Sequence, residues 1–322
     1  FIYDSHELMD DKIIFDTLPS SYDDEGTSDH MVITLRDKNH GYTLKLYYSV
    51  YPENDVITRS ACFINSSEDI VELSRAMGAL IDFPETSYKI TSFHGAWTRE
   101  MGRSDIVLTG GKFVNSSFTG TSSSRSNPLV LMARENTTED MGLCYGFNTV
   151  YSGNHYEAFE VNSFGKTRFV AGINPDSFSF TLEKGEKFEI PEVVLTCSSS
   201  GYNGISCNFH GFVRKHIVRG KYRDALRPVL LNSWEANYFN IDEGKLTRLA
   251  KKGKEAGVEL FVMDDGWFGD RSDDKRALGD WTENKKKLPG GLKGICDKIH
   301  GIGMDFGVWI EPEMINVDSD LY

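Results

Sequence analysis

The feature that most restricts the fold is an alternation of apolar runs and helical patterns in residues 228–310. Apolar runs lie at 228–233, 258–263 and 304–310, and amphipathic helical patterns lie between them at 242–256 and 292–300. An apolar run of this length fits a strand that is buried on both faces. Because a strand, a helix and a second strand in succession form a right-handed parallel crossover, this region predicts a parallel sheet covered by helices.

Two α/β arrangements contain such crossovers, the doubly wound sheet and the (β/α)8 TIM barrel. A doubly wound sheet that binds nucleotides carries a glycine-rich phosphate loop after its first strand. Here the first strand is followed by Asn232-Ser233-Trp234-Glu235, which favours the barrel. A barrel needs eight strands to close, and only three are expected before Tyr322. We therefore expect the first three βα units of a truncated barrel.

The chain before residue 201 follows a different pattern, in which short strands are separated by turns. Strand patterns lie at 31–35, 42–50, 57–64, 106–108, 129–133 and 157–161, turn clusters lie at 52–55, 65–67 and 183–186, and a Ser/Thr/Gly-rich loop lies at 116–126. This pattern is typical of a large antiparallel sandwich. A short helix at 209–218 and a linker at 219–227 follow. The sequence thus predicts a multidomain chain, with an all-β sandwich at 1–222 and the barrel part at 223–322.

Charge and hydropathy exclude several classes of function. The net charge of −13 disfavours a nucleic-acid partner, because phosphates need a basic surface, and it suits an uncharged ligand. No run of 18 apolar residues is present, so no membrane span is expected.

The five cysteines are scattered and contain no CxxC pair. This pattern provides neither a zinc site nor a disulfide framework, which favours a reducing cytoplasm. We therefore expect a cytoplasmic protein without a metal or a cofactor. The first residue is Phe1 rather than Met, so we also expect residues to precede it.

The carboxyl ends of the three predicted strands carry tryptophan together with carboxylates. The first ends in Asn232-Ser233-Trp234-Glu235, the second in Asp264-Asp265-Gly266-Trp267-Phe268, and the third in Trp309-Ile310-Glu311-Pro312-Glu313-Met314. Barrel active sites lie at these ends. Tryptophan faces stack on sugar rings, and carboxylates accept several hydroxyl hydrogen bonds. This edge of the sheet therefore suits a carbohydrate.

A structural explanation exists for each of these residues taken alone. One Asp after a strand is more often a helix cap or a turn residue, and one Trp is more often part of a core. Three strand ends that share the pattern favour a site. In the long loop 266–291, the spacing of Asp270, Asp273 and Asp274 does not match a calcium-binding loop, so we interpret them as solvated acids. The run at 285–287, all lysine, is interpreted as a charged surface segment.

Four motifs together resemble the α-galactosidases of glycoside hydrolase family 36. They are Leu231-Asn232-Ser233-Trp234-Glu235-Ala236, Phe261-Val262-Met263-Asp264-Asp265-Gly266-Trp267-Phe268-Gly269, Phe306-Gly307-Val308-Trp309-Ile310-Glu311-Pro312-Glu313-Met314 and, upstream, His94-Gly95-Ala96-Trp97-Thr98-Arg99-Glu100. The resemblance implies a β-supersandwich followed by a (β/α)8 barrel and a small β domain. It also implies hydrolysis, with retention, of terminal α-linked galactose from melibiose, raffinose and stachyose.

Matched motif by motif, the resemblance also implies a set of substrate contacts. Asp264 and Asp265 would bind galactose hydroxyls, those on C4 and C6. Trp234 and Trp309 would shape the sugar pocket, and Trp97 would reach it from the sandwich. The family is commonly tetrameric, so we expect a homo-oligomer that takes galactose-containing oligosaccharides.

The catalytic carboxylates of the family have no match in this sequence. The family nucleophile is the Asp of a Lys-Trp-Asp motif, and the acid/base is a later Asp. We expect both beyond Tyr322, so no catalytic residue is expected within this chain, and the chain alone should be inactive. Two alternatives share the fold, a galactosyltransferase and an α-N-acetylgalactosaminidase. A non-catalytic carbohydrate-binding protein is the alternative from another class.

Overall fold

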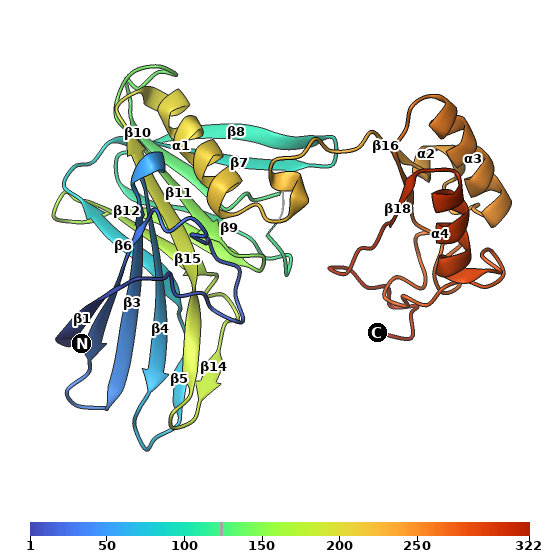
Figure 1. Cartoon of the computed structure of the whole chain (residues 1–322). Coiled ribbons are helices and arrows are strands. Elements are labelled where there is room, and N and C mark those ends of the chain that lie inside the picture. The colour runs from blue at the N-terminus through green and yellow to red at the C-terminus, as the bar shows by residue number, and fades with distance from the viewer. Residues whose placement is uncertain (123–124) are drawn as a thin grey trace. The chain divides into compact units, whose positions relative to one another are not determined.

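The protein is described by a computed structural model that covers residues 1–122 and 125–322. It divides into two compact units, Phe1–Arg223 and Asp224–Tyr322, which are drawn together in Figure 1. Ser123 and Ser124, inside the expected loop at 116–126, lie outside the described residues. Within the described ranges, no helix combines the length and the apolar character needed to span a membrane.

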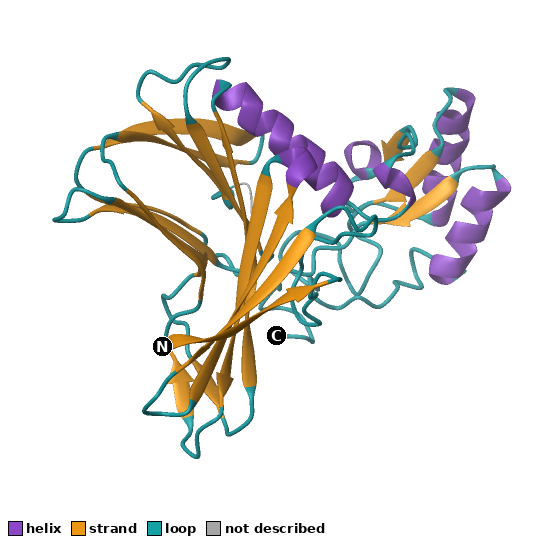
Figure 2. Ribbon diagram, turned by 60° about the vertical axis from the view of Figure 1, so that its left-hand side comes forward, coloured by secondary structure: helices purple, strands orange, loops and turns teal. Residues whose placement is uncertain are grey.

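The first unit is built mainly from antiparallel strands (Figure 2). One set comprises β1 (Ile2–Met9), β2 (Asp29–Arg36), β3 (Tyr42–Tyr51), β4 (Val56–Asn65), β7 (Tyr88–Ala96), β8 (Arg99–Leu108), β10 (Leu129–Arg134), β11 (Cys144–Val150) and β15 (Lys187–Ser198). Within the described residues they form a nine-stranded sheet in the order β1-β2-β3-β4-β15-β11-β10-β7-β8. The expected strands at 31–35, 42–50, 57–64 and 129–133 all lie in this sheet.

A second sheet packs on the first and creates the main core of the unit. It comprises β6 (Met77–Phe83), β9 (Gly111–Ser116), β12 (His155–Val161) and β13 (Thr167–Ile173), in the order β6-β13-β12-β9. Phe147 of β11 stacks on Phe169 of β13 with 4.0 Å between ring centroids, and Phe159 of β12 is fully buried beside them. A short pair, β5 (Val71–Leu73) and β14 (Phe180–Leu182), and the 3-10 turn η1 (Pro52–Asn54) complete the regular structure before β15 ends. The unit is therefore a β-sandwich.

Helix α1 (Gly201–His216) covers the outer side of the large sheet (Figure 1). It begins at Gly201 rather than at Phe209, where the expected helix at 209–218 starts, and its first turn contains Gly201 and Gly204. Those glycines allow close packing: a Cβ on Gly204 would lie 2.1 Å from Ser198 Oγ, and a Cβ on Gly146 of β11 would lie 2.4 Å from the ring of Phe209. The 3-10 turn η2 (Lys221–Arg223) then ends the unit.

The second unit contains a parallel sheet of three strands in residues 224–322, all of which are described. The strands are β16 (Leu230–Asn232), β17 (Leu260–Met263) and β18 (Asp305–Val308), in that order, and the helices are α2 (Trp234–Asn237), α3 (Glu243–Glu255) and α4 (Gly291–Gly301). Asp242 caps α3 by accepting a hydrogen bond from the Lys245 N–H (2.7 Å), as the capping rule expects. Phe261 and Met263 of β17 share one buried cluster with Leu246 of α3 and Ile295 of α4.

A fully buried ion pair joins three strands of the sandwich. The Nδ1 of His155 lies 2.8 Å from Glu157 Oε2, and its Nε2 lies 2.8 Å from the Ser126 carbonyl. Since both ring nitrogens face acceptors, the ring is a charged imidazolium that donates twice. Glu157 also accepts from Asn115 Nδ2 (2.9 Å) and Thr149 Oγ1 (2.6 Å). The pair thereby connects β12 with β9, with β11 and with the segment that leads into β10.

The charge on His155 makes the stability of the first unit dependent on pH. Burial lowers the pKa of His155, but the hydrogen bond and the charge of Glu157, together with the Ser126 carbonyl, raise it by more, so the pKa lies above its ordinary value of 6.5. Because the folded pKa exceeds the unfolded one, the pair stabilises the fold fully below pH 6.5. This stabilisation is lost as the pH rises through the folded pKa.

We expect His155→Gln to lower the free energy of unfolding of the first unit by about 3–5 kcal/mol, since it leaves Glu157 buried without its cation. Urea unfolding at a series of pH values from 6.5 upward measures this. The wild type should lose stability across the series, whereas the variant should change less. His210→Gln, at an exposed position on α1, is the matched control. Parallel pH curves for the wild type and His155→Gln would contradict the assignment.

Candidate functional site

The carboxyl ends of the three parallel strands meet at one edge of the sheet in the second unit. Asn232 pairs with Val262 across β16 and β17, and Met263 pairs with Val308 across β17 and β18. The chain continues the pairing beyond the strands, because the Ser233 N–H donates to the Val262 carbonyl (3.0 Å) and the Trp309 N–H donates to the Met263 carbonyl (2.9 Å). The residues that follow the three strands are therefore neighbours.

Asp264 lies at the centre of this edge and is 9% exposed. Its Oδ2 accepts a hydrogen bond from the Asn232 amide, and its Oδ1 accepts from the Asp265 N–H (2.7 Å). The Oδ1 of Asn232 accepts from the Trp234 N–H (2.7 Å), so Asn232 links Asp264 to the start of α2. A carboxylate has about four lone-pair sites. Two of them are occupied here, so Asp264 can accept further hydrogen bonds.

Asp265 points to different partners and is 5% exposed. Its Oδ1 accepts from the Gly266 N–H (2.6 Å) and from Arg271 Nε (3.0 Å), and its Oδ2 accepts from Arg271 Nη2 (2.8 Å). This is a two-pronged arginine–carboxylate pair, which is stronger and more directional than a single contact. Most of the acceptor capacity of Asp265 is therefore used within the chain.

Arg271 is itself buried, with 4% of its surface exposed. Besides Asp265, its Nη1 donates to the Arg276 carbonyl (2.8 Å) and to Asn316 Oδ1 (2.9 Å). The guanidinium also lies 5.4 Å from the ring centroid of Phe239. Sequence patterns did not single out Arg271. The available signal was that it is the one cation in the acidic stretch 264–274.

The interpretation of the lysine run at 285–287 as a surface segment is wrong for its last member. Lys285 and Lys286 are exposed, but Lys287 is partly buried. Its Nζ donates to the carbonyls of Phe239 (2.9 Å), Gly266 (2.8 Å) and Arg271 (2.7 Å). Burial lowers the pKa of Lys287, and the charges of Asp265 and Asp270 oppose that shift. Its partners are distant in sequence, so the local pattern carried no signal for its role.

Two of the three expected tryptophans lie at this edge of the second unit. Trp234 is partly buried, and its ring makes edge contacts with Tyr238 (5.2 Å between centroids) and Phe239 (5.0 Å). Trp309 packs in part against the core of the unit, and its carbonyl accepts from Trp267 Nε1 (2.9 Å). The structure thus brings Trp234 and Trp309 to the edge that carries the two aspartates.

Trp97 lies in the first unit, at the tip of the hairpin formed by β7 and β8. Ala96 pairs with Arg99, so Trp97 and Thr98 form a two-residue turn, in which Thr98 has a φ of 62°. The Trp97 side chain is 89% exposed. A large aromatic ring held out on a tight hairpin is available for a contact outside its own sheet.

Glu311, which follows β18, is a third carboxyl of the strand-end pattern, and it is not among the expected substrate contacts. It is partly buried. Burial raises the pKa of Glu311, the charges of Glu313 and Asp265 add to the rise, and Arg271 opposes it. Glu311 is thus a further carboxyl that lies close enough to feel the charges of Asp265 and Arg271.

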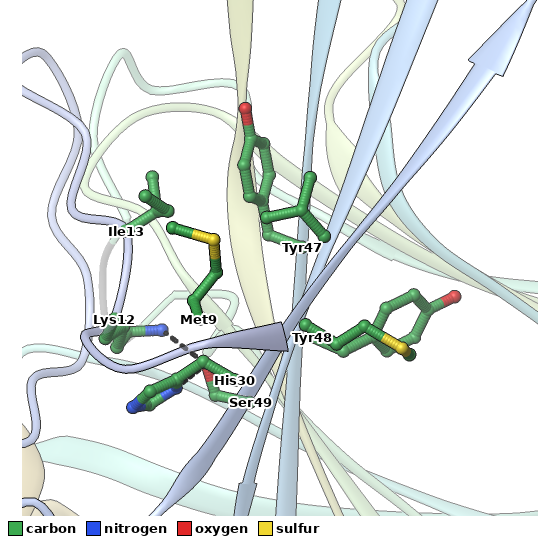
Figure 3. A pocket seen from close by; sticks show the side chains of 9 residues that line it. Met9, Lys12, Ile13, His30, Tyr47, Tyr48 and Ser49 are labelled. Atoms are coloured by element: carbon green, nitrogen blue, oxygen red, sulfur yellow. Dashed lines mark hydrogen bonds between the residues drawn. The ribbon is translucent and has the colours of Figure 1, made fainter. Parts of the chain in front are cut away.

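Within the described residues, neither a metal-binding cluster nor the small pocket drawn in Figure 3 offers a competing site. Residues 1–122 and 125–322 contain no group of three or more His, Cys, Asp or Glu side chains arranged to hold a metal ion. Figure 3 shows a small pocket of the first unit, lined in part by Lys12, His30 and Ser49. Its polar groups bind one another: Ser49 Oγ contacts Lys12 Nζ (3.4 Å) and His30 Nδ1 (2.9 Å). We therefore interpret this pocket as part of the internal packing.

Two family profiles match the chain. The glycosyl hydrolase family 36 N-terminal domain matches residues 1–183, and the melibiase family matches residues 187–322. Among curated relatives, α-galactosidase AgaA of Geobacillus stearothermophilus is 41% identical over 99% of this chain and 44% of its own length. α-Galactosidase Mel36A of Lactobacillus acidophilus is 39% identical over 99% of this chain and 44% of its own length.

A solved structure agrees with the match in sequence. A crystal structure of an AgaA variant in complex with raffinose has a TM-score of 0.94 at 40% identity, covering 99% of this chain and 45% of that chain. The chain therefore spans less than half the length of these relatives. The family resemblance drawn from the four sequence motifs is confirmed, and the chain belongs to glycosyl hydrolase family 36.

Proposed function

We propose that this chain forms the sandwich and the start of the catalytic barrel of a retaining α-galactosidase, which removes terminal α-D-galactosyl residues from galactosides such as melibiose and raffinose. The observation that carries the proposal is the pair Asp264 and Asp265 at the carboxyl ends of parallel strands, between Trp234 and Trp309. The relatives named α-galactosidase, one of them solved with raffinose, support this substrate class.

The barrel is part of the proposal, with the sandwich at 1–222 and the barrel portion at 223–322. The outer strands support it, because Leu230 of β16 and Val308 of β18 are exposed apolar residues on the two edges of the sheet. An open parallel sheet with apolar edges is unusual, since parallel sheets are normally covered. Further βα units would pair with these edges and close the barrel.

The geometry of the edge suits a neutral sugar. Asp264 retains acceptor capacity on both oxygens, and Asp265 retains less, so the two can receive hydroxyl hydrogen bonds, which we assign to C4 and C6 of galactose. Trp234 and Trp309 would form apolar walls against the sugar ring. Trp97 would add a contact from the sandwich, in a homo-oligomer as is common in the family.

The two aspartates bind rather than catalyse in this proposal. Retaining hydrolysis needs a nucleophile and an acid/base whose carboxyls are about 5–5.5 Å apart on either side of the bond. Asp264 and Asp265 are neighbours in the chain, and Asp265 is paired with Arg271. We therefore assign the nucleophile and the acid/base to positions beyond Tyr322.

Purified full-length protein that contains this chain tests the proposal. Turnover of melibiose and raffinose is expected, whereas transfer from galactinol to sucrose would identify a galactosyltransferase. Preference for an α-N-acetylgalactosaminide would identify the related glycosidase, and saccharide binding without turnover would identify a binding protein. The 322-residue chain tested alone should not hydrolyse an aryl α-galactoside. Turnover that is abolished by mutating one of its own carboxylates would show that the catalytic pair lies within it.

Asp264→Asn in the full-length enzyme should reduce kcat/KM on an aryl α-galactoside by about 10- to 100-fold, because each charged hydrogen bond contributes about 1.5–3 kcal/mol. Asp265→Asn should reduce kcat/KM similarly and also lower the Tm, since it leaves the buried Arg271 without its partner. Steady-state kinetics and thermal unfolding measure both effects. Asp297→Asn, on the exposed side of α4, is the control. Wild-type kcat/KM in both site variants would refute the assignment.

Trp97→Ala should raise KM for raffinose roughly two- to tenfold, as expected for the loss of one aromatic contact, and should leave the Tm near that of the wild type because Trp97 is 89% exposed. Phe164→Ala is the matched control, since it also removes an exposed aromatic ring: Phe164 is 86% exposed on another turn of the sandwich. It should change neither quantity. A drop in Tm with an unchanged KM would mean that Trp97 serves packing instead of substrate.

A further inference from the structure

Arg271 is the most highly connected cation at the strand-end edge. Its guanidinium has five N–H donors. Nε and Nη2 reach Asp265, and Nη1 reaches both the Arg276 carbonyl and Asn316 Oδ1. With 4% of its surface exposed, Arg271 is enclosed by these partners and does not present its charge to solvent. Its influence on a bound molecule must therefore pass through the groups that it holds.

Those groups come from the segments that follow the second and third strands. Asp265 follows β17. Asn316 follows β18 and is fixed in turn by Leu278, whose N–H donates to Asn316 Oδ1 (3.1 Å) and whose carbonyl accepts from the Asn316 N–H (3.0 Å). Arg271 thus ties the end of the second strand to the loop after the third.

Lys287 extends the same network to the segment after the first strand. Its ammonium joins the Arg271 carbonyl to the carbonyls of Gly266 and Phe239, and Phe239 follows α2. Gly266 has a φ of 97°, and a Cβ there would lie 3.2 Å from the Phe239 backbone, so the two segments approach closely. Arg271 and Lys287 together hold all three strand-end segments in one arrangement.

The network fixes both aspartates. The Arg271 guanidinium binds both oxygens of Asp265. This contact fixes the plane of the carboxylate, and therefore the direction from which it can accept a further hydrogen bond. The Asp265 N–H donates to Asp264 Oδ1, so a displacement of Asp265 would also displace the Asp264 carboxylate. We propose that Arg271 is a positioning residue that aims the Asp264–Asp265 pair at the hydroxyls of the bound galactoside. This inference rests on the proposed function.

A purely stabilising ion pair is the competing explanation. A buried pair is weak evidence for stability, because desolvation offsets much of its attraction. The two explanations differ in their kinetics. A positioning role depends on the planar fork, which lysine cannot reproduce although it keeps the charge. A misplacement of about 1 Å at a binding group can cost about 100-fold in rate, whereas a stabilising role changes the Tm and leaves kcat/KM of the folded enzyme intact.

The test uses Arg271→Lys, Asp265→Asn and the double variant in the full-length enzyme, with Arg248→Lys at an exposed position on α3 as the control. Activity on an aryl α-galactoside is referred to the folded fraction measured by circular dichroism. We expect Arg271→Lys to lower kcat/KM about 100-fold. The kcat/KM of the double variant should be no lower than that of the less active single variant, because both changes disrupt the same Arg271–Asp265 pair. A kcat/KM within twofold of the wild type, or losses that multiply, would overturn the positioning role.

Asn316→Ser decides the matter if Arg271→Lys does not fold. It weakens one contact of Nη1 and leaves the pair with Asp265, so kcat/KM should fall by a smaller factor with the Tm near that of the wild type. An unchanged kcat/KM in this variant would overturn the inference. Absence of turnover in the wild-type full-length protein would overturn the proposed function and this inference together. An active wild type, with an unchanged kcat/KM in Arg271→Lys, would overturn the inference alone.

Discussion

Charge that is buried has to be paired, and both units of this chain are organised around such pairs. In the second unit, Arg271 meets Asp265, and the Lys287 ammonium is surrounded by three carbonyls. In the first unit, His155 meets Glu157, and Lys12 meets Glu192 (2.9 Å). Further hydrogen bonds of these groups reach segments that are distant in the chain, such as β9, β11 and the loop after β18, so the charged groups help to set the relative positions of loops and strands.

The repetitive part of the fold could be predicted from sequence because it depends on local pattern. The helices expected at 242–256 and 292–300 lie within one residue of α3 and α4 at each end. The start of α1 could not be predicted in the same way. Gly204 lowers helix propensity, yet the contact with Ser198 leaves no space for a side chain at that position. Tertiary packing therefore overrides propensity there.

The candidate site, too, could be predicted only in part from the sequence. The sequence indicates that Asp264, Asp265, Trp234 and Trp309 share an edge, because parallel strands present their carboxyl ends together. It does not indicate what holds them. Arg271 and Asn316 are 45 residues apart, and Lys287 reaches back 48 residues to Phe239. Contacts of this kind depend on where loops cross in space, which neither periodicity nor spacing records. A lysine in a charged run and an arginine in an acidic loop therefore resemble surface residues until the loops are placed.

The orientation of the acidic pair is set within the second unit. The partners that orient Asp264 and Asp265 lie between Asn232 and Asn316, inside the second unit. The direction of the acidic pair is therefore set locally, by βα loops that bind one another. The proposed sugar pocket as a whole would require more, because two carboxylates and two partly buried indole rings would contact only part of a galactose. In the proposed barrel, residues on further strands would enclose the rest and supply the reacting carboxyls. Local networks of charged groups would thus fix the binding groups, and closure of the barrel would bring the catalytic groups to them.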